Sequence, residues 1–243
     1  MMLEIHEVNK NFGGIRALQN CSMTVEEGRI TDIIGPNGSG KTTLFNAITR
    51  LLPIDAGSIR FRETEITSVP DFKVARMGIS RTFQEVRLFP NLSIRDHLSI
   101  ALSTTDEDFF RNLVKWKQDP DDEIKEILSL ISLDKPLDTY ATDLSYGQRK
   151  LLDLAIAIGK PHQLLMLDEP VAGVNPRLRD EIKDILRQLN ARGETVLLIE
   201  HDMNFVMDLV DHIVVMDAGQ VIARGSPDEI QNDPKVLEAY LGG

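Results

Sequence analysis

The sequence predicts an α/β fold built around a mainly parallel β-sheet, and three observations support this prediction. From residue 144 onward, short apolar runs alternate with helix-patterned segments, which is the order typical of parallel sheets. Near the N-terminus, a glycine-rich turn joins a strand-like run to a helix-like run. The chain has 243 residues, of which 42% are hydrophobic, so it can bury a sizeable core. We therefore expect one α/β domain, alone or with a small subdomain.

The first third of the chain is expected to be rich in β-structure. Residues 2–8 alternate between apolar and polar side chains, which is typical of a half-buried strand. The expected strands of this part are residues 2–8, 21–25, 29–34, 57–61 and 79–83. Helices are expected over residues 41–52, directly after the glycine-rich turn, and near residues 71–77. The clearest unit here is thus a strand, a glycine-rich loop and a helix.

Residues 104–138 differ from the rest of the chain in charge and in pattern. Ten acidic residues stand against five basic ones, and little of the segment resembles a strand. Ile124, Ile127, Leu128 and Ile131 recur at i, i+3, i+4 and i+7, which predicts an amphipathic helix. We interpret the segment as a small helical subdomain inserted in the chain. Its charges are interpreted as a solvated outer face, in preference to a specific acidic binding site.

The last part of the chain has the regular order of a parallel sheet with covering helices. The expected strands are residues 164–167, 195–199 and 213–215, and the expected helices are residues 148–158, 176–192 and 203–209. Ligands of such sheets bind beyond the carboxyl ends of the strands. Gly35, Asp168 and His201 would all emerge at this edge, so three distant segments converge on one predicted site.

Residues 35–42 match the P-loop pattern G-x-x-x-x-G-K-T and lie between an apolar strand and a helix. Glycines let successive backbone N–H groups point toward an anion, and the helix N-terminus adds partial positive charge. Lys41 is predicted to contact the β- and γ-phosphates of ATP, and the Thr42 hydroxyl to bind Mg²⁺. A flexible turn that merely caps a helix is the disfavoured alternative. The predicted nucleotide-binding residues of the loop are Gly35, Pro36, Asn37, Gly38, Ser39, Gly40, Lys41, Thr42 and Thr43.

Two acids, Asp168 and Glu169, directly follow the apolar strand 164–167. Carboxylates in such a place are costly unless a cation or a polar ligand meets them. Asp168 is predicted to hold Mg²⁺, directly or through water, and Glu169 to polarise the water that attacks the γ-phosphate. The alternative is that the two acids only cap the next helix, which Pro170 would suit. The presence of the P-loop favours the catalytic interpretation.

His201 follows the strand 195–199, so its imidazole is expected at the same edge of the sheet. There it could hydrogen-bond the γ-phosphate. A lone histidine is more often a structural or surface residue. Its position after a core strand favours the functional role.

The segment Leu144-Ser145-Tyr146-Gly147-Gln148 discriminates among P-loop proteins. Together with the P-loop and the two acids, it resembles the signature of the nucleotide-binding subunit of ABC transporters. Ser145 and the backbone of Gly147 open the next helix, which gives a second anion-binding helix terminus. The resemblance implies that this terminus, with Gln148, caps the ATP held by the P-loop of a partner subunit. Taken alone, a serine before a helix is an ordinary N-cap.

The resemblance covers nearly the whole chain and implies roles for two further residues. Gln84 is similar to the glutamine that senses Mg²⁺ and water and contacts the membrane subunits. Phe12 is similar to the aromatic residue that stacks on adenine. The alternatives are a surface glutamine and a core or hairpin aromatic residue. The implied catalytic residues are Glu169, His201, Lys41 and Gln84, and the implied metal ligands are Thr42, Gln84 and Asp168.

The fold implied by the resemblance is a single domain over residues 1–243. Residues 1–85 and 140–243 would form a P-loop NTPase core with a mainly parallel sheet and an N-terminal antiparallel β part. Residues 86–139 would form the inserted α-helical subdomain.

Several segments are similar to the larger ATPase subunit of branched-chain amino-acid importers. They are residues 75–84, 86–89, the signature with Tyr146, residues 200–203 and the ending 239–242. This resemblance implies hydrophobic or related amino acids as cargo, with ATP and Mg²⁺ as cofactors. The implied partners are two integral-membrane permease subunits, a second ATPase subunit and, indirectly, an extracytoplasmic solute-binding protein. The chain would then lie at the cytoplasmic face of the cell membrane, held by the permease subunits.

Three positions depart from the general pattern of the ABC family. Tyr146 replaces the first glycine of the signature, Asn175 stands where an acid is usual, and Phe12 replaces the commoner tyrosine. None of these changes removes a group that performs hydrolysis.

Composition disfavours several other classes of protein. The net charge of -11 disfavours a nucleic-acid partner, because phosphate neutralisation needs clustered lysine and arginine. The single cysteine, Cys21, cannot form an intramolecular disulfide, and no run approaches the about 18 apolar residues of a membrane-spanning helix. Two rival hypotheses remain. One is an ABC-type ATPase that serves assembly or regulation, and the other is a P-loop phosphotransferase, which would need no signature loop.

Overall fold

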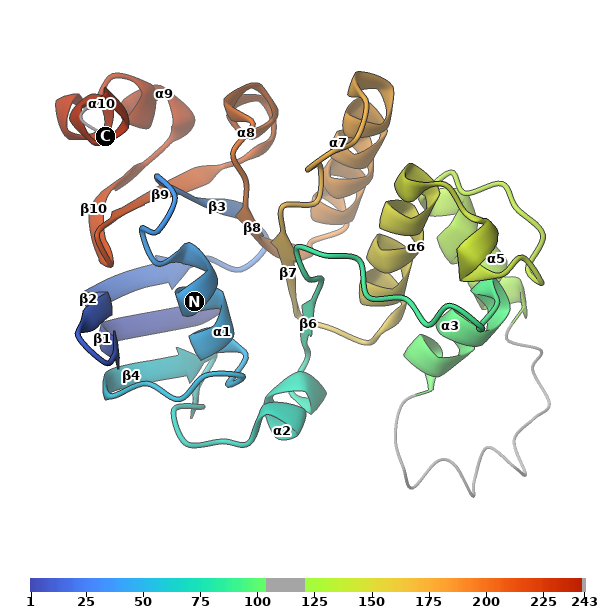
Figure 1. The fold of residues 1–243 in the computed structure, drawn as a ribbon, viewed down its shortest axis with the longest axis horizontal. Helices are drawn as coiled ribbons and strands as arrows, with labels where there is room; N and C mark the ends of the chain where they lie inside the picture. The colour runs from blue at the N-terminus through green and yellow to red at the C-terminus, as the bar shows by residue number, and fades with distance from the viewer. Residues whose placement is uncertain (104–120, 242–243) are drawn as a thin grey trace.

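The structure, a computed structural model, describes residues 1–103 and 121–241 (Figure 1). Four acids of the acidic segment and the glycine of the ending lie outside these residues: Asp106, Glu107, Asp108, Asp119 and Gly242. Within the described residues, the strands form a four-stranded sheet and a six-stranded sheet, and helices cover them. The predicted α/β fold with a mainly parallel sheet is confirmed.

The four-stranded sheet is the N-terminal antiparallel part of the molecule and has the order β2-β1-β4-β5. Its strands are β1 (Leu3–Phe12), β2 (Ile15–Val25), β4 (Ala56–Phe61) and β5 (Thr64–Glu65). The hairpin between β1 and β2 reverses at Gly13 and Gly14, and Phe12 lies at its tip.

The six-stranded sheet has the order β10-β9-β3-β8-β7-β6, and all its strands except the edge strand β10 are parallel. Its strands are β3 (Ile30–Ile34), β6 (Ile79–Arg81), β7 (Leu164–Asp168), β8 (Thr195–Ile199), β9 (His212–Asp217) and β10 (Gln220–Gly225). Strand β8 lies between β3 and β7, and Ile199 pairs with both Ile33 and Asp168. The residues that follow these three strands therefore emerge together at one edge.

The helices cover the six-stranded sheet and extend beyond one of its ends (Figure 1). They are α1 (Lys41–Ile48), α2 (Asp71–Arg76), α3 (Ile94–Leu102), α5 (Asp121–Leu130), α6 (Tyr146–Gly159), α7 (Pro176–Ala191), α8 (Met203–Leu209), α9 (Pro227–Gln231) and α10 (Pro234–Leu241), with a 3₁₀-helix over Ala141–Asp143. Among the described residues, no helix combines the length and the apolar character needed to cross a bilayer.

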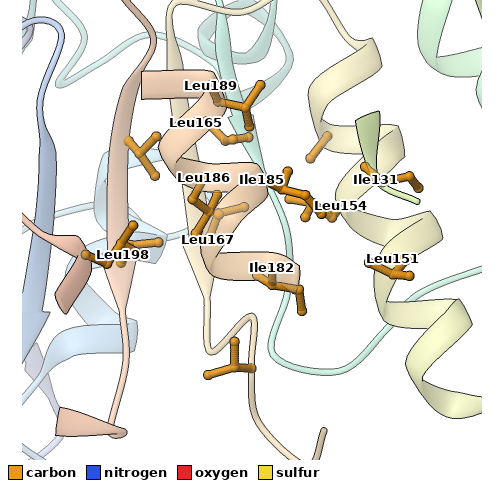
Figure 2. Packing of buried hydrophobic residues seen from close by; sticks show 14 of the residues in the cluster. Ile131, Leu151, Leu154, Leu165, Leu167, Ile182, Ile185, Leu186, Leu189 and Leu198 are labelled. Carbon is orange, nitrogen blue, oxygen red and sulfur yellow. The ribbon is translucent and has the colours of Figure 1, made fainter. Parts of the chain in front are cut away.

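The two faces of the six-stranded sheet are buried in two separate hydrophobic clusters. Alternate side chains of a strand point to opposite faces, so Leu165 and Leu167 belong to one cluster and Leu164 and Met166 to the other. The first cluster contains α5, α6, α7 and α8, and Figure 2 shows Ile182 and other residues of α7 packed over β7. The second cluster contains α1 and the four-stranded sheet. The parallel strands are thus apolar throughout because both faces are covered.

Helices α3 and α5 lie beside α6, on the side of the molecule away from the four-stranded sheet (Figure 1). The predicted amphipathic helix is present, since Ile124, Ile127, Leu128 and Ile131 are all buried. These residues share one cluster with the sheet residue Leu165. The predicted subdomain boundaries at residues 86 and 139 stay a prediction, because the apolar core is continuous across them.

Several elements have no counterpart in the sequence expectations, namely α3, β5, β10, α9 and α10. Strand β10 is an edge strand whose residues Val221 and Ile222 are only half-buried. Its run of apolar residues is therefore too short to predict a strand from the sequence. Helix α3 begins at Ser93, which forms a capping box with Asp96. This S-x-x-D pattern is a sequence signal that could have located the start of the helix.

Candidate active site

Residues 35–40 form the loop between β3 and α1, and its backbone requires glycine. Gly35, Gly38 and Gly40 have φ angles of 149°, 81° and 102°. A Cβ at Gly35 would lie 2.0 Å from the Met216 carbonyl oxygen, and a Cβ at Gly40 would lie 2.5 Å from the Ala17 carbonyl oxygen. The loop can pack this closely against neighbouring backbone only because Gly35 and Gly40 carry no side chain, whereas Gly38 is needed for its positive φ angle.

The N-terminus of helix α1 follows this loop and can bind an anion. Gly40 is its N-cap, and no side chain of the described residues caps the N–H groups there. Unpaired N–H groups at a helix start carry partial positive charge. Thr42 is exposed in the first turn, so its hydroxyl can reach a cation. The loop therefore fits the phosphate groups of a nucleotide.

The side chain of Lys41 folds back over the loop. Its Nζ donates hydrogen bonds to the carbonyl oxygens of Gly35 at 2.8 Å and Pro36 at 3.0 Å, and the residue is buried. Burial lowers the pKa of the Lys41 ammonium, and the nearby carboxylates of Glu169, Asp32 and Asp168 oppose this shift. The ammonium thus lies between the phosphate-binding loop and the acids that follow the strands.

Three predicted catalytic side chains come together from the segments that follow β6, β7 and β8. Gln84 donates through Nε2 to Oε2 of Glu169 at 3.1 Å, and Nε2 of His201 lies 3.1 Å from Oε1 of the same carboxylate. Glu169 has a positive φ of 50°, and its N–H donates to the Ile199 carbonyl oxygen at 2.9 Å. Each oxygen of its carboxylate therefore has a partner, Gln84 on one side and His201 on the other.

Asp168 ends β7 and is paired with Arg81. The two side chains are 3.0 Å apart, from Nη2 to Oδ2. Burial raises the pKa of Asp168, and the charge of Arg81 opposes this shift. Among the described residues no group of three His, Cys, Asp or Glu side chains could hold a metal ion. The predicted metal ligands Thr42, Gln84 and Asp168 stay a prediction; a set with a single carboxylate is of the kind that Mg²⁺ takes together with water and phosphate oxygens.

The signature segment forms the start of α6. Ser145 is the N-cap, its Oγ accepts from the Gln148 N–H at 3.3 Å, and Oε1 of Gln148 accepts from the Ser145 N–H at 3.0 Å. A Cβ at Gly147 would lie 2.6 Å from Cδ2 of Leu178, so a larger residue would press on α7. Among the described residues, no hydrogen bond joins this segment to the P-loop of the same chain. Its role toward a partner's nucleotide stays a prediction.

Phe12 offers an exposed aromatic face near the tip of the β1–β2 hairpin. The residue is 48% exposed, and Nζ of Lys10 lies 5.6 Å from the centre of its ring. An exposed ring of this kind can stack on a flat base. The predicted stacking on adenine is compatible with this position and stays a prediction.

The chain matches known protein families. A family model described as ABC transporter matches residues 18–172. The chain belongs to the ABC transporter ATP-binding family. A second model, described as branched-chain amino acid ATP-binding cassette transporter, matches residues 220–243 of this ABC protein. The resemblance found in the sequence is thereby confirmed.

Similar proteins and similar solved structures belong to the same family. The probable branched-chain amino acid transport ATP-binding protein LivG of Archaeoglobus fulgidus is 38% identical, covering 99% of this chain and 95% of that protein. BraF of Pseudomonas aeruginosa, a high-affinity branched-chain amino acid transport ATP-binding protein, is 37% identical, covering 99% and 98%. A crystal structure of an ABC transporter cassette in its ADP conformation has a TM-score of 0.84 at 34% identity, covering 100% and 99%. A nucleotide-free cassette has a TM-score of 0.85 at 35% identity, covering 100% and 99%.

Two departures from the general ABC pattern have local roles in this structure. The hydroxyl of Tyr146 donates to the Ala172 carbonyl oxygen at 3.2 Å, and its ring lies against Gly173. Asn175 is the N-cap of α7, and its Oδ1 accepts from the Leu178 N–H at 2.9 Å. Asparagine and aspartate cap helices about equally well, so Asn175 retains the cap that an acid would provide.

Two buried residues of this ABC site were not singled out from the sequence. Lys150 of α6 donates through Nζ to the Glu169 carbonyl oxygen at 2.9 Å. The Glu200 carboxylate accepts from the N–H groups of Val171 at 2.9 Å and His201 at 3.0 Å. A signal for each exists in the sequence, because Lys150 interrupts an apolar helix face and Glu200 directly follows an apolar strand.

Proposed function

We propose that this chain is the ATP-binding and ATP-hydrolysing subunit of an importer for branched-chain or other hydrophobic amino acids. The observation that carries the catalytic part is the Glu169 carboxylate, held between Gln84 and His201 next to the P-loop. The amino-acid cargo is supported by the family model over residues 220–243 and by the names of relatives that match along nearly the whole chain.

The proposed reaction is hydrolysis of the bond between the β- and γ-phosphates. Lys41 and the N–H groups of the P-loop bind the phosphate oxygens, and Thr42, Gln84 and Asp168 would hold Mg²⁺. When bound, Mg²⁺ neutralises charge on the phosphate oxygens. Glu169 orients a water molecule and accepts its proton while the water oxygen attacks the γ-phosphorus. The bond to the bridging oxygen breaks, ADP leaves with the electron pair, and the proton passes on to phosphate.

His201 has a second task in this proposal. Its imidazole contacts the Glu169 carboxylate at 3.1 Å and is 40% exposed as a side chain. The part of the ring that is exposed would be free to hydrogen-bond a γ-phosphate oxygen while the ring contacts the carboxylate. It would align the base with the reacting group.

The proposed working form is a head-to-tail dimer of ATPase subunits on two permease subunits. Ser145, Gly147 and Gln148 would cap the ATP bound to the partner's P-loop, since a helix start binds anions. ATP would favour the closed dimer, and this preference is what can move coupled membrane subunits. The chain would then lie at the cytoplasmic face of the membrane, and an extracytoplasmic solute-binding protein would deliver the cargo.

Phosphate release tests the catalytic part of the proposal. Wild type is expected to release phosphate to water, and Glu169→Gln to lose about 10²- to 10⁴-fold in kcat. Glu181→Gln, at a half-buried position of α7 whose carboxylate pairs with the exposed Arg177, is the matched control and is expected to keep wild-type activity. Transfer of phosphate to a metabolite in place of water would contradict the proposal and favour a phosphotransferase.

Two further experiments test the dimer and the cargo. Glu169→Gln is expected to shift from monomer to dimer on size-exclusion chromatography when ATP is added, and Ser145→Arg in the same protein to abolish the shift. In proteoliposomes with the permease subunits, labelled leucine is expected to accumulate only with ATP. Accumulation of a different solute class, with no uptake of leucine, would contradict the cargo.

A further inference from the structure

Lys150 is a buried lysine of α6 whose side chain connects two loops of the candidate active site. Its Nζ donates to the Glu169 carbonyl oxygen at 2.9 Å and to the Gln84 carbonyl oxygen at 3.4 Å. Only 5% of the residue is exposed. The side chains of these same two residues meet at 3.1 Å. One ammonium group therefore holds the backbones of both members of this pair.

The burial of this lysine needs a reason, because a buried charge is costly unless it is well partnered. Among the described residues, the hydrogen-bond partners of Lys150 are carbonyl oxygens rather than carboxylates. The carboxylates of Asp153, Glu200 and Glu169 act on its charge through space. An ammonium group has three N–H donors and no acceptor, so it is suited to joining two carbonyl groups. An apolar residue at this place would fill the space but leave both carbonyls without this donor.

Lys150 lies on the same helix, α6, as the signature segment. The helix begins at the N-cap Ser145, and Lys150 lies five residues later. At the helical rise this is about 7.5 Å along the axis. Because a helix moves as a rigid element, a displacement of the N-terminal end of α6 also displaces the Lys150 ammonium group and the two carbonyl groups that it binds. The same helix thus carries both the signature segment and the anchor of the two loops.

We propose that Lys150 is a positioning residue for ATP hydrolysis, which couples the placement of Glu169 and Gln84 to the position of α6. This inference rests on the proposed function, because it concerns the same site. Lys150 acts through the backbones of the two residues and does not touch the substrate. When α6 docks on the nucleotide of a partner subunit, Glu169 and Gln84 of its own chain shift with it. The rate of hydrolysis in one subunit then depends on how its signature helix is engaged.

The test compares Lys150→Met with wild type in phosphate release and in nucleotide binding. Because a displaced catalytic group loses rate more than binding, kcat is expected to fall by about ten- to hundredfold. The KM for ATP is expected to change by less than about twofold. Lys150→Arg keeps a cationic donor and is expected to recover a large part of kcat. Lys125→Met, which removes an exposed lysine of α5, is the matched control and is expected to match wild type.

Other outcomes separate this inference from the proposed function. Thermal unfolding is measured on every variant, and Lys150→Gln, whose head group is polar, takes the place of Lys150→Met if the latter does not fold. A lowered Tm with wild-type kcat would show a purely structural role and overturn the inference, as would equal changes in kcat and KM. A wild-type protein that binds ATP but never hydrolyses it would overturn the proposed function itself.

Discussion

The guanidinium of Arg81 lies 3.0 Å from the Asp168 carboxylate, in a pair whose side chains are only 6% and 3% exposed. Arg81 also donates to Asn46 at 2.8 Å and to Thr49 at 3.2 Å, both at the end of α1. Arg81 therefore connects the helix after the P-loop with the predicted metal ligand. Arg81, the last residue of β6, thus links the C-terminal end of α1 to the last residue of β7.

Removal of Arg81 is expected to destabilise the protein strongly. In Arg81→Met the Asp168 carboxylate is left buried without its partner, a change that typically costs about 3–5 kcal/mol. Urea unfolding at neutral pH measures this loss. Arg177→Met breaks an exposed ion pair with Glu181 on α7 and serves as the control, with a much smaller expected loss. Equal losses in the two variants would contradict the structural importance of the buried pair.

Alanine substitutions at three glycines are expected to give a graded loss of stability. Gly14→Ala meets no atom within 4 Å and is expected to have little effect. Gly38→Ala also meets no atom, but its φ of 81° costs about 1–2 kcal/mol for a residue with a Cβ. Gly35→Ala would place a Cβ 2.0 Å from the Met216 carbonyl oxygen and is expected to cost most and to prevent nucleotide binding.

Urea unfolding and binding of a fluorescent ATP analogue check this order. Gly14→Ala is the built-in control, because it changes the hairpin next to Phe12 without a clash. If Gly35→Ala bound nucleotide as well as Gly14→Ala, the close packing of the loop against β9 would not be required for the cradle.

The alternation of apolar strands and helices was sufficient to predict the parallel sheet from the sequence. Strands buried on both faces read as continuous apolar runs, and Leu164–Leu167 and Thr195–Ile199 have this form. The P-loop pattern and the order of strands predicted that Gly35, Asp168 and His201 would emerge at one edge of the sheet, whereas the role of Gln84 was implied only by the family resemblance. In the structure Gln84 and His201 both contact the Glu169 carboxylate, an arrangement that the motifs alone did not specify.

The features that the sequence did not predict depend on long-range packing. Lys150 is on a helix far along the chain from Gln84, and only tertiary contact reveals that it reaches the Gln84 carbonyl oxygen. Asp32 lies inside the apolar strand β3, where its carboxylate is fully buried. Its burial beside Glu200 raises its pKa well above the usual range. The surroundings of such groups come from distant parts of the chain, which a local pattern cannot identify.

Asp153 of α6 is expected to make stability depend on pH in an unusual direction. Burial raises its pKa from 3.8 to about 6, and the charge of Lys150 opposes this shift. Because the folded-state pKa exceeds the unfolded value, the folded state binds this proton more tightly between the two pKa values. Asp153 therefore makes its full contribution to the free energy of unfolding below pH 4, and this contribution is lost as the pH rises through about 6. Well above that pH, the loss in the free energy of unfolding due to this group reaches about 3 kcal/mol.

Asp153→Asn removes this titration and is expected to be more stable than wild type at pH 8, with the advantage disappearing toward pH 4. Urea unfolding at one-unit pH intervals measures the difference, and Asp143→Asn, at an exposed position, is the control. A difference between Asp153→Asn and wild type that stays constant from pH 4 to pH 8 would contradict the raised pKa.

Glu200 is expected to hold together the loops that carry two of the proposed catalytic residues. Its Oε1 accepts from the Val171 N–H at 2.9 Å, in the loop after Glu169, and its Oε2 accepts from the His201 N–H at 3.0 Å. In Glu200→Ala both donors lose their partner inside the protein, and each buried unpaired donor costs about 1–3 kcal/mol. Glu200→Gln keeps one acceptor oxygen and is expected to lose about half as much stability.

The same two variants separate stability from the geometry of the site. Because Glu169 and His201 are joined only while both loops keep their places, kcat is expected to fall further in Glu200→Ala than in Glu200→Gln. Phosphate release at a temperature well below the Tm of each variant measures this effect, with Glu126→Ala on the exposed face of α5 as the control. A Glu200→Ala protein that is less stable yet has wild-type kcat would show that other contacts position the two loops. The hydrogen bond from Lys150 to the Glu169 carbonyl oxygen would then be the first such contact to test.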